Sequence, residues 1–211
     1  MESASMRKLN ASLLRALAFI GSLFCGCVDV QAQSALPRFE VGPVLSVVHD
    51  IEVLPSADRL AVGGRFTINF NPHIAFDSDA LITTSRGFSG LNTGGRLTQG
   101  YFGIKAGTRW NKIDIFGKVR PGFWSYAEVI TGQTGATPPM PILSRFTYPA
   151  VDVGGVVEFY LSRRFALRYD IGDTVVHYHE VIFNNSASPF IIPSVTTHSF
   201  QFSTGISYRF K

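Results

Sequence analysis

The chain has 211 residues, of which 45% are hydrophobic and 13% aromatic, while only 16% are charged. This length fits one domain, and the 20 glycines and 18 phenylalanines favour an all-β fold over a helical one. The formal net charge is +4 and the basic residues are spread along the chain, which argues against a nucleic-acid-binding surface.

The first 32 residues have the pattern of a cleaved secretory signal peptide. Basic residues precede an apolar run over 16–28, and a small-residue site ending at Ala32 follows it, which predicts cleavage after Ala32. A retained transmembrane anchor is the alternative, but the run is short and is broken by glycine and serine. The only two cysteines, Cys25 and Cys27, lie in this segment, so the exported chain would have no disulfide and no thiolate metal site. Lipid attachment at Cys27 is a second alternative.

Eight segments follow in which apolar and polar residues alternate. Alternation with a period of two predicts strands, and segments of about ten residues separated by turn signals are typical of transmembrane barrels. From residue 38 onward no apolar run is long enough for a membrane-spanning helix. The expected strands cover 38–48, 59–70, 73–83, 96–108, 113–126, 148–160, 165–176 and 198–210.

The connections between these segments alternate in length. Three are tight, at 71–72, 109–112 and 161–164, and four are longer, near 49–58, 84–95, 127–147 and 177–197. Outer-membrane barrels have an even number of strands, short periplasmic turns and longer extracellular loops. The pattern therefore predicts an eight-stranded antiparallel up-and-down transmembrane β-barrel over 38–211, with both termini on the periplasmic side.

Charged residues gather on one face of the expected strands, and their signs balance. In a membrane barrel this face would line the lumen, where buried charges must be paired, so we expect a closed, ion-paired lumen. The six acids are Glu40, Asp77, Asp79, Asp152, Glu158 and Asp170, and the six bases are Arg65, Lys105, Lys118, Arg120, Arg168 and Arg209.

A soluble lipocalin-like barrel that binds a ligand is the alternative, because it also satisfies the alternation with the two faces exchanged. The aromatic residues favour the membrane, since they fall at both ends of the expected strands, as in two interfacial girdles. Those near the short turns are Phe39, Phe70, Trp110, Phe159, Tyr160, Phe165, Tyr208 and Phe210, and those near the long loops are Phe123, Trp124, Tyr126, Tyr148 and Phe200.

The strand pattern resembles that of small eight-stranded outer-membrane β-barrels, of the OmpA transmembrane-domain and OmpX type. More closely, the sequence resembles uncharacterised exported bacterial outer-membrane β-barrel proteins that contain stretches such as "GGRLTQGYFGIKAG", "FGKVRPGF", "VDVGGVVEFYLSRRFALRYDIGD" and a final "FQFSTGISYRF". The resemblance covers about residues 38 to 211 and implies a bacterial outer-membrane location, in contact with lipid and lipopolysaccharide. It also implies that the barrel-assembly machinery recognises the last strand through Tyr208 and Phe210. Here Lys211 follows the final Phe, which departs from the usual ending in an aromatic residue.

Catalytic and cofactor motifs are not recognisable in the sequence, so we expect neither an enzyme nor a bound cofactor. A lipase elbow is missing, and Ser199 and His198 would point to opposite faces of a strand. His177, His179 and His198 are weak candidates for a metal site, because the seventh and eighth strands are hairpin neighbours. Histidines at the membrane interface are the simpler interpretation.

The loops over 127–147 and 177–197 combine proline, glycine and exposed apolar residues. Long loops of this composition suggest adhesion to an extracellular partner or packing across the barrel mouth. We therefore expect a structural or adhesive barrel. A lipid-modifying barrel enzyme and a small pore remain the alternatives.

Overall fold

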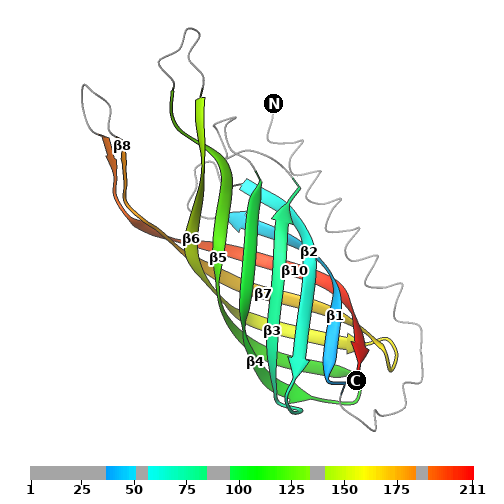
Figure 1. Cartoon of the computed structure of the whole chain (residues 1–211). Helices are drawn as coiled ribbons and strands as arrows, with labels where there is room; N and C mark the ends of the chain where they lie inside the picture. The colour runs from blue at the N-terminus through cyan, green and yellow to red at the C-terminus, as the bar shows by residue number, and fades with distance from the viewer. Residues whose placement is uncertain (1–36, 51–56, 85–95, 134–140, 184–189) are drawn as a thin grey trace, which may run out of the picture. The chain divides into compact units, whose positions relative to one another are not determined.

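The computed structural model describes residues 37–50, 57–84, 96–133, 141–183 and 190–211, which contain a closed antiparallel β-barrel (Figure 1). Its strands lie around the barrel in the order β1-β10-β7-β6-β5-β4-β3-β2, so the last strand pairs with the first. They are β1 (Phe39–Asp50), β2 (Ala57–Asn69), β3 (Ile74–Thr83), β4 (Leu97–Arg109), β5 (Ile113–Gln133), β6 (Pro141–Tyr160), β7 (Phe165–Tyr178) and β10 (Val195–Phe210). The prediction of an eight-stranded up-and-down barrel is confirmed.

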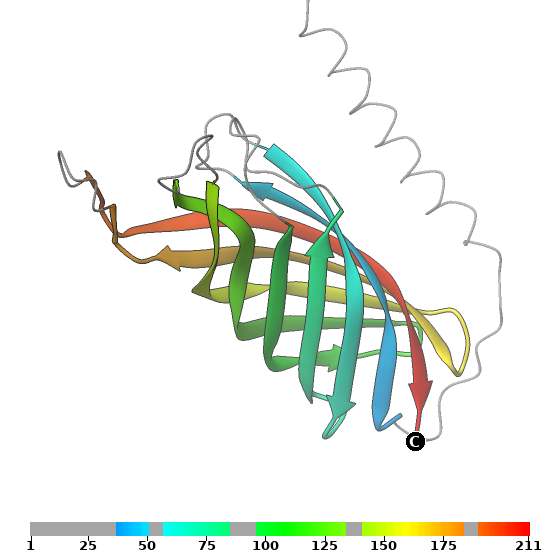
Figure 2. The same cartoon turned by 45° about the horizontal axis from the view of Figure 1, so that its top comes forward.

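The barrel strands are inclined to the barrel axis and wrap around it (Figure 2). Along each strand buried and exposed residues alternate, as in β7, because successive side chains point to opposite faces. Within the described residues no helix is long and apolar enough to cross a membrane. The predicted signal peptide over 1–32 lies outside the described residues, so its cleavage stays a prediction.

Three short turns join the strands at one end of the barrel, which we call the turn end, and the predicted positions of these turns are confirmed. Between β2 and β3 the Asn71 side-chain oxygen accepts the backbone N–H groups of His73 and Ile74, both at 2.8 Å. Between β6 and β7 the Ser162 hydroxyl accepts the N–H of Phe165 at 3.1 Å. The last residues of β10 lie at the same end (Figure 1). We call the opposite end the loop end.

Two of the predicted loops contain more strand than expected. β5 continues to Gln133 and β6 begins at Pro141, and a two-stranded sheet of β8 (Val181–Phe183) and β9 (Phe190–Ile192) lies within 177–197. The pairing of β5 with β6 shifts register between Tyr126 and Val129 and again between Ile130 and Gly132. Such bulges interrupt the two-residue period, so the sequence pattern of this hairpin resembles a loop.

Gly63 and Gly64 in β2 differ in how closely the neighbouring strand approaches them. A Cβ added to Gly63 would lie 1.8 Å from the carbonyl oxygen of Ala80 in β3, whereas one added to Gly64 meets no atom within 4 Å. Gly63 therefore lets β2 and β3 approach closely where the sheet curves.

We expect Gly63→Ala to lower the free energy of unfolding by about 1–3 kcal/mol, because β3 would have to move away. Gly64→Ala is the matched control and should leave stability unchanged or raise it slightly, since alanine restricts the unfolded chain. Urea unfolding of the two refolded variants measures the difference. Equal stability of both would contradict the close approach at Gly63.

Candidate functional site

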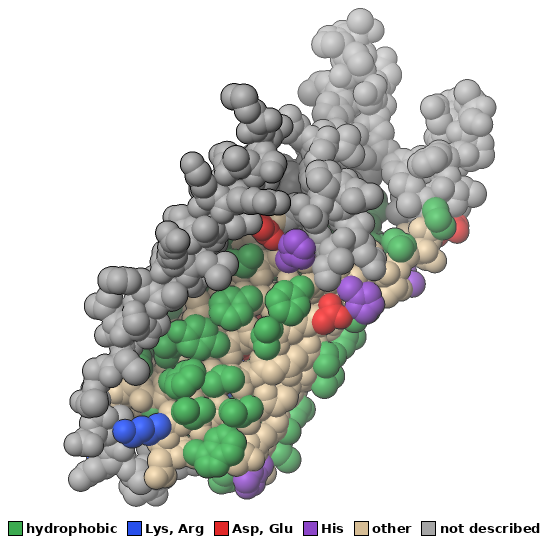
Figure 3. All heavy atoms as spheres, turned by 180° about the vertical axis from the view of Figure 1, so that it is seen from behind, with side chains coloured by type: hydrophobic (Ala, Val, Ile, Leu, Met, Phe, Trp, Pro, Cys, Tyr) green, Lys and Arg blue, Asp and Glu red, His purple; other side chains and the backbone are tan. Residues whose placement is uncertain are grey.

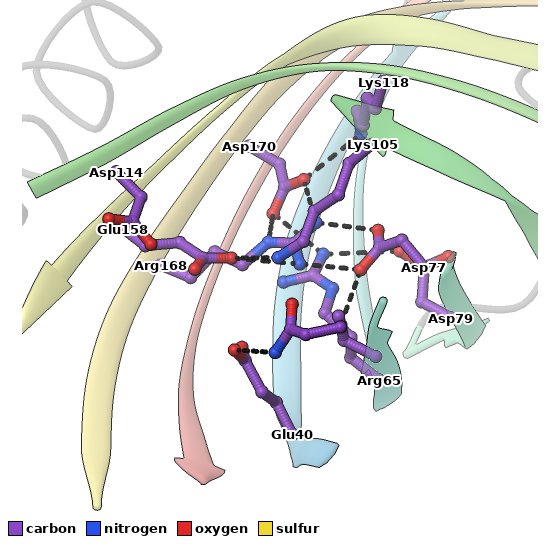
Figure 4. A network of polar contacts seen from close by, with 12 residues as sticks. Glu40, Arg65, Asp77, Asp79, Lys105, Asp114, Lys118, Glu158, Arg168 and Asp170 are labelled. Carbon is purple, nitrogen blue, oxygen red and sulfur yellow. Dashed lines mark hydrogen bonds and ion pairs between the residues drawn. The ribbon is translucent and has the colours of Figure 1, made fainter. Parts of the chain in front are cut away.

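The twelve charged side chains predicted to line the lumen are all buried, with relative exposures of 5% or less, and they come from all eight barrel strands. Figure 4 shows many of them converging in the barrel interior. The structure brings them together in one polar network. The members are Glu40, Arg65, Asp77, Asp79, Lys105, Lys118, Arg120, Asp152, Glu158, Arg168, Asp170 and Arg209.

Asp77 of β3 lies between two arginines. Arg168 donates from Nη1 and Nη2 to the two carboxylate oxygens of Asp77, at 2.7 and 2.8 Å. Arg120 Nη1 donates to Asp77 Oδ2 at 2.8 Å, and the Thr67 hydroxyl donates to Oδ1 at 2.7 Å. Because β3 and β7 lie on opposite sides of the ring of strands, the bond between Asp77 and Arg168 crosses the lumen.

Other acids of the network also contact more than one base. Asp170 lies 2.8 Å from Arg65 Nη2 and 3.4 Å from Lys118 Nζ. Asp152 lies 2.9 Å from Lys118 Nζ and 2.7 Å from Arg120 Nη2. Four of the bases contact two or three acids each, so neutralising one side chain would affect several partners. They are Arg65, Lys118, Arg120 and Arg168. The further pairs are Arg65–Asp79 (3.3 Å), Arg120–Asp79 (2.7 Å), Arg168–Asp170 (2.9 Å), Arg168–Glu158 (3.4 Å) and Lys105–Glu158 (2.5 Å).

Toward the turn end the network includes groups that the sequence interpretation missed. Glu40 Oε1 lies 3.4 Å from Arg209 Nε and 3.9 Å from Arg109 Nη1. Arg109 Nη1 also lies 3.5 Å from Asp114 Oδ2, which accepts a hydrogen bond from the Tyr160 hydroxyl. Two buried acids and two bases therefore meet at this end of the lumen.

The alternation of the strands could have identified some of the missed residues. Asp114 lies four residues before Lys118 in the same strand, so both side chains point into the lumen, and Asp114 is fully buried. Arg59 lies six residues before Arg65 in β2, so it also points inward, and it is 6% exposed. Both could have been assigned to the lumen from the strand pattern. Arg109 was missed because it is the first residue of the predicted turn over 109–112, whereas in the structure it is the last residue of β4.

An aromatic cluster fills the lumen toward the loop end. Trp124 is completely buried, and its indole N–H donates to the Tyr101 hydroxyl. The hydroxyls of Tyr126 and Tyr178 lie 2.9 Å apart, and the ring of Tyr148 lies 4.6 Å from that of Tyr178, between centroids. Apolar side chains pack around this cluster, namely Val48, Leu97, Ala150 and Val176.

The prediction that Trp124, Tyr126, Tyr148 and Tyr160 belong to interfacial girdles is therefore wrong. Trp124 and Tyr126 lie at even-numbered positions of β5, like the buried Lys118 and Arg120, so their side chains point into the lumen. Tyr160 lies two residues after Glu158 in β6 and points inward with it. Its ring centre lies 4.2 Å from the guanidinium carbon of Arg209. These aromatics lie at the expected ends of the strands but on the opposite face.

The outer face of the barrel is apolar. Phe102, Val119 and Ile171 are more than half exposed, at 54%, 55% and 51%. Figure 3 shows hydrophobic side chains forming a belt on one side of the barrel, with acids and histidines at its upper margin. A water-soluble barrel would place such residues inside, so the structure has the inverted arrangement of a transmembrane barrel.

The three histidines considered for a metal site do not converge. His198 Nδ1 lies 2.7 Å from Asp173 Oδ2, whereas His177 Nδ1 lies 3.0 Å from the Thr196 hydroxyl. The rings of His177 and His179 are neighbours, with centroids 5.4 Å apart. In the part of the chain that the structure describes, no group of three or more potential ligands is placed to hold a metal ion.

Tyr208 and Phe210, the predicted assembly signal, lie on the outer face at the end of β10, each 38% exposed. The exposed Lys211 follows them. The middle parts of the two long loops, 134–140 and 184–189, lie outside the described residues.

Comparison with known proteins identifies the fold. No protein-family model and no curated protein sequence matches the chain. Among solved structures, Neisserial surface protein A is similar with a TM-score of 0.57 at 11% identity, covering 82% of this chain and 97% of that one. The outer membrane protein OprG of Pseudomonas aeruginosa gives 0.49 at 11% identity, over 86% and 99% of the two chains. Ail, the attachment invasion locus protein of Yersinia pestis, gives 0.44 at 12% identity, over 82% and 96%.

Proposed function

We propose that this chain, which has the fold of the small eight-stranded outer-membrane barrels, is a non-enzymatic bacterial outer-membrane protein with a closed lumen and a structural or surface-interaction role. The observation that carries the proposal is the separation of the two faces, with ion-paired charges inside and an apolar belt outside. The barrel contacts lipid and lipopolysaccharide, and the assembly machinery recognises its last strand.

The apolar belt supports insertion into a membrane. Membrane-spanning strands need about 9–11 residues when tilted. In β10 the outward side chains from Phe200 to Phe210 span eleven residues and carry no charge. Soluble monomers rarely expose apolar patches larger than a few hundred Å². The lipocalin-like alternative needs the charged face outside and the apolar face inside, which is the reverse of the arrangement found.

The packing of the interior supports a closed lumen. A barrel of eight strands has an interior about wide enough for side chains to fill. Here Arg120, Arg168 and Lys105 extend into it and are almost completely buried. Trp124 and its neighbours occupy the loop end of the same interior. This filling disfavours the small-pore alternative.

Fractionation and electrical recording together test the proposal. The protein should be found in the outer-membrane fraction and should migrate differently on a gel before and after heating, as folded membrane barrels do. Reconstituted into a planar bilayer, it should give no stable large conductance, because the side chains fill the lumen. Recovery as a soluble periplasmic protein would overturn the location, and a stable large conductance would overturn the closed lumen.

The hairpin of β5 and β6 supports an interaction role at the loop end. β4 pairs with β5 only as far as Tyr126, and β7 pairs with β6 only from Ala150. Beyond these points β5 and β6 pair with each other, for example Ile130 with Leu143, and the hairpin continues past the barrel (Figure 1). We propose that this hairpin and the loop over 177–197 contact an extracellular partner.

Replacing 128–143 with a tight turn tests this role. The variant should keep the heat-dependent gel shift of the barrel, since the barrel contacts are retained, and should lose adhesion of whole cells to host or abiotic surfaces. An equivalent shortening of 84–95 is the control. Unchanged adhesion in the β5–β6 variant would leave only the structural role.

A further inference from the structure

Aromatic side chains continue the lumen cluster outward, beyond the last pair of β6 with β7. Phe146 and Tyr148 lie four and two residues before the buried Ala150 in β6, so they are on its inner face. Their rings are nearly parallel, at 8°, with centroids 6.3 Å apart. The ring of Tyr178 lies 4.6 Å from that of Tyr148, and the ring of His179 lies 6.2 Å from it. We call these four aromatic side chains the aromatic platform.

The aromatic platform is accessible, whereas the rings on its lumen side are buried. Trp124 and Tyr126 have exposures of 0% and 5%, while the platform rings are partly or fully exposed. The ring of Tyr126 lies 6.3 Å from that of Tyr148 and 6.4 Å from that of Tyr178, so it supports both of them. Rings held in place lose little conformational entropy when they bind a partner. The platform contains no carboxylate, lysine or arginine, so an uncharged partner fits it best.

The strand edges of the β5–β6 hairpin are unsuited to pairing with another strand. β6 contains Pro141 and Pro149, which lack an N–H group, and the exposed Arg145 lies between them. β5 has two register shifts between Tyr126 and Gly132. Prolines, charged residues and bulges are features by which natural edge strands avoid pairing with a further strand. A partner of this hairpin therefore fits its face better than its edges.

The outer end of the same hairpin has a proline sequence of a kind that aromatic surfaces bind. Gln133 and Pro141 are the last pair of the ladder, so 134–140 connect the two strands at that end. The sequence over 137–141 is Thr-Pro-Pro-Met-Pro, with prolines three positions apart at Pro138 and Pro141. Pro-x-x-Pro segments dock on aromatic-lined surfaces, because their extended conformation is stiff and loses little entropy on binding. We call 137–141 the proline tip; its chemistry complements that of the aromatic platform.

The proline tip cannot reach the aromatic platform of its own molecule. Phe146 and Tyr148 are five and seven residues from Pro141 in β6, which corresponds to about 17 and 23 Å along a strand. The connection over 134–140 is anchored at both ends, so its middle extends at most about 14 Å from the last pair. A contact between tip and platform therefore needs two molecules.

We propose that the proline tip docks on the aromatic platform of a second copy of this chain in an opposing membrane. The inference rests on the proposed function, because both copies must present their loop ends outside a membrane. The hairpin continues past the barrel, so the hairpins of two facing copies can overlap (Figure 1). One hairpin carries both halves of the contact, so a two-fold axis pairs each tip with the other copy's platform. This contact joins cells that both carry the protein.

Clustering of lipid vesicles that contain the full chain tests the inference. The variant F146A/Y148A removes the platform, and the variant P138A/P139A/P141A removes the tip. Native vesicles should cluster, and either variant alone should cluster at least about tenfold less, as expected when the anchors of an interface are lost. Vesicles of one variant mixed with vesicles of the other should cluster again, because an intact tip then meets an intact platform.

Further measurements make this result specific. The variant R145A changes the opposite face of β6 and should cluster like the native chain. A peptide covering 133–143 should inhibit native clustering, whereas the same peptide with alanine at its three proline positions should not. Raising the salt from about 0.1 M to about 0.5 M should not weaken clustering, since the sequence over 131–144 has no charged residue. The heat-dependent gel shift verifies that each variant is folded.

The outcomes separate this inference from the proposed function. Failure of the native chain to insert into vesicles and to show the gel shift would overturn the membrane location itself. Inserted native chain that does not cluster vesicles, or folded variants that do not complement each other, would overturn the docking of two copies while leaving the membrane location intact. Inhibition of clustering by a neutral glucan, without any effect of the proline peptide, would assign the platform to a glycan instead of the tip.

Discussion

Replacing Arg168 with methionine is expected to lower the free energy of unfolding by about 3–5 kcal/mol, because it leaves buried carboxylates without their main counter-charge. Arg168 is completely buried and contacts Asp77, Asp170 and Glu158. Methionine keeps much of the side-chain volume, so the loss reports on charge and hydrogen bonding rather than on a cavity. Urea unfolding of the protein in lipid vesicles measures the difference.

Two further variants make this result specific. Arg145→Met removes an exposed arginine at the loop end and should change stability by less than about 0.5 kcal/mol. Adding Asp77→Asn to Arg168→Met removes the carboxylate that Arg168 contacts through two hydrogen bonds, and should recover part of the lost stability. A loss below about 1 kcal/mol for Arg168→Met would mean that water replaces the arginine, and the lumen would then be hydrated rather than sealed by ion pairs.

Strand alternation was sufficient to predict the barrel and the burial of its charged face. Alternation assigns Arg65, Asp77 and Arg168 to one face, and the structure places all three inside. The alternation of short and long connections predicts the strand count and the turn end, because tight turns such as that at Asn71 have a recognisable composition. Both signals are local in the sequence, which is why they could be used without a structure.

The partners within the lumen could not be predicted in this way. Arg168 and Asp77 are separated by 91 residues and lie on opposite sides of the barrel. Their contact depends on the tilt and stagger of all the intervening strands, which alternation does not determine. The inward position of Trp124 is a different case, because the alternation of β5 alone predicts it. The interfacial role was suggested only by the place of Trp124 near the end of the expected strand.

The extension of β5 and β6 was also beyond the sequence pattern. Both register shifts of this hairpin fall between Tyr126 and Gly132, so the regular two-residue period is interrupted within a few residues. Proline and glycine in the same region are typical of loops as well as of irregular strand ends. The pairing that stabilises the hairpin is thus visible only once the two strands are placed side by side.

Replacing Val119 with arginine is expected to cost about 2–4 kcal/mol, because it places a charge near the middle of the apolar belt. Val119 is 55% exposed, and its cross-strand neighbours Ile104 and Val153 are exposed at 44% and 46%. In a water-soluble barrel the same substitution at an exposed site would change stability by no more than about 0.5 kcal/mol. The substitution therefore distinguishes lipid from water around the barrel, independently of cell fractionation.

Depth along the strand supplies the control for this experiment. Thr108→Arg places the same side chain on the outer face of β4, near the turn end, where arginine should cost only about 0–1 kcal/mol because it reaches the headgroups. Val119→Leu changes the size of the side chain without adding charge and should be nearly neutral. If arginine at position 119 lowers the free energy of unfolding strongly while both controls lower it little, the middle of the strand must be surrounded by an apolar medium. Small and equal costs for all three variants would mean that water surrounds the belt, and the outer-membrane proposal would fail on physical grounds.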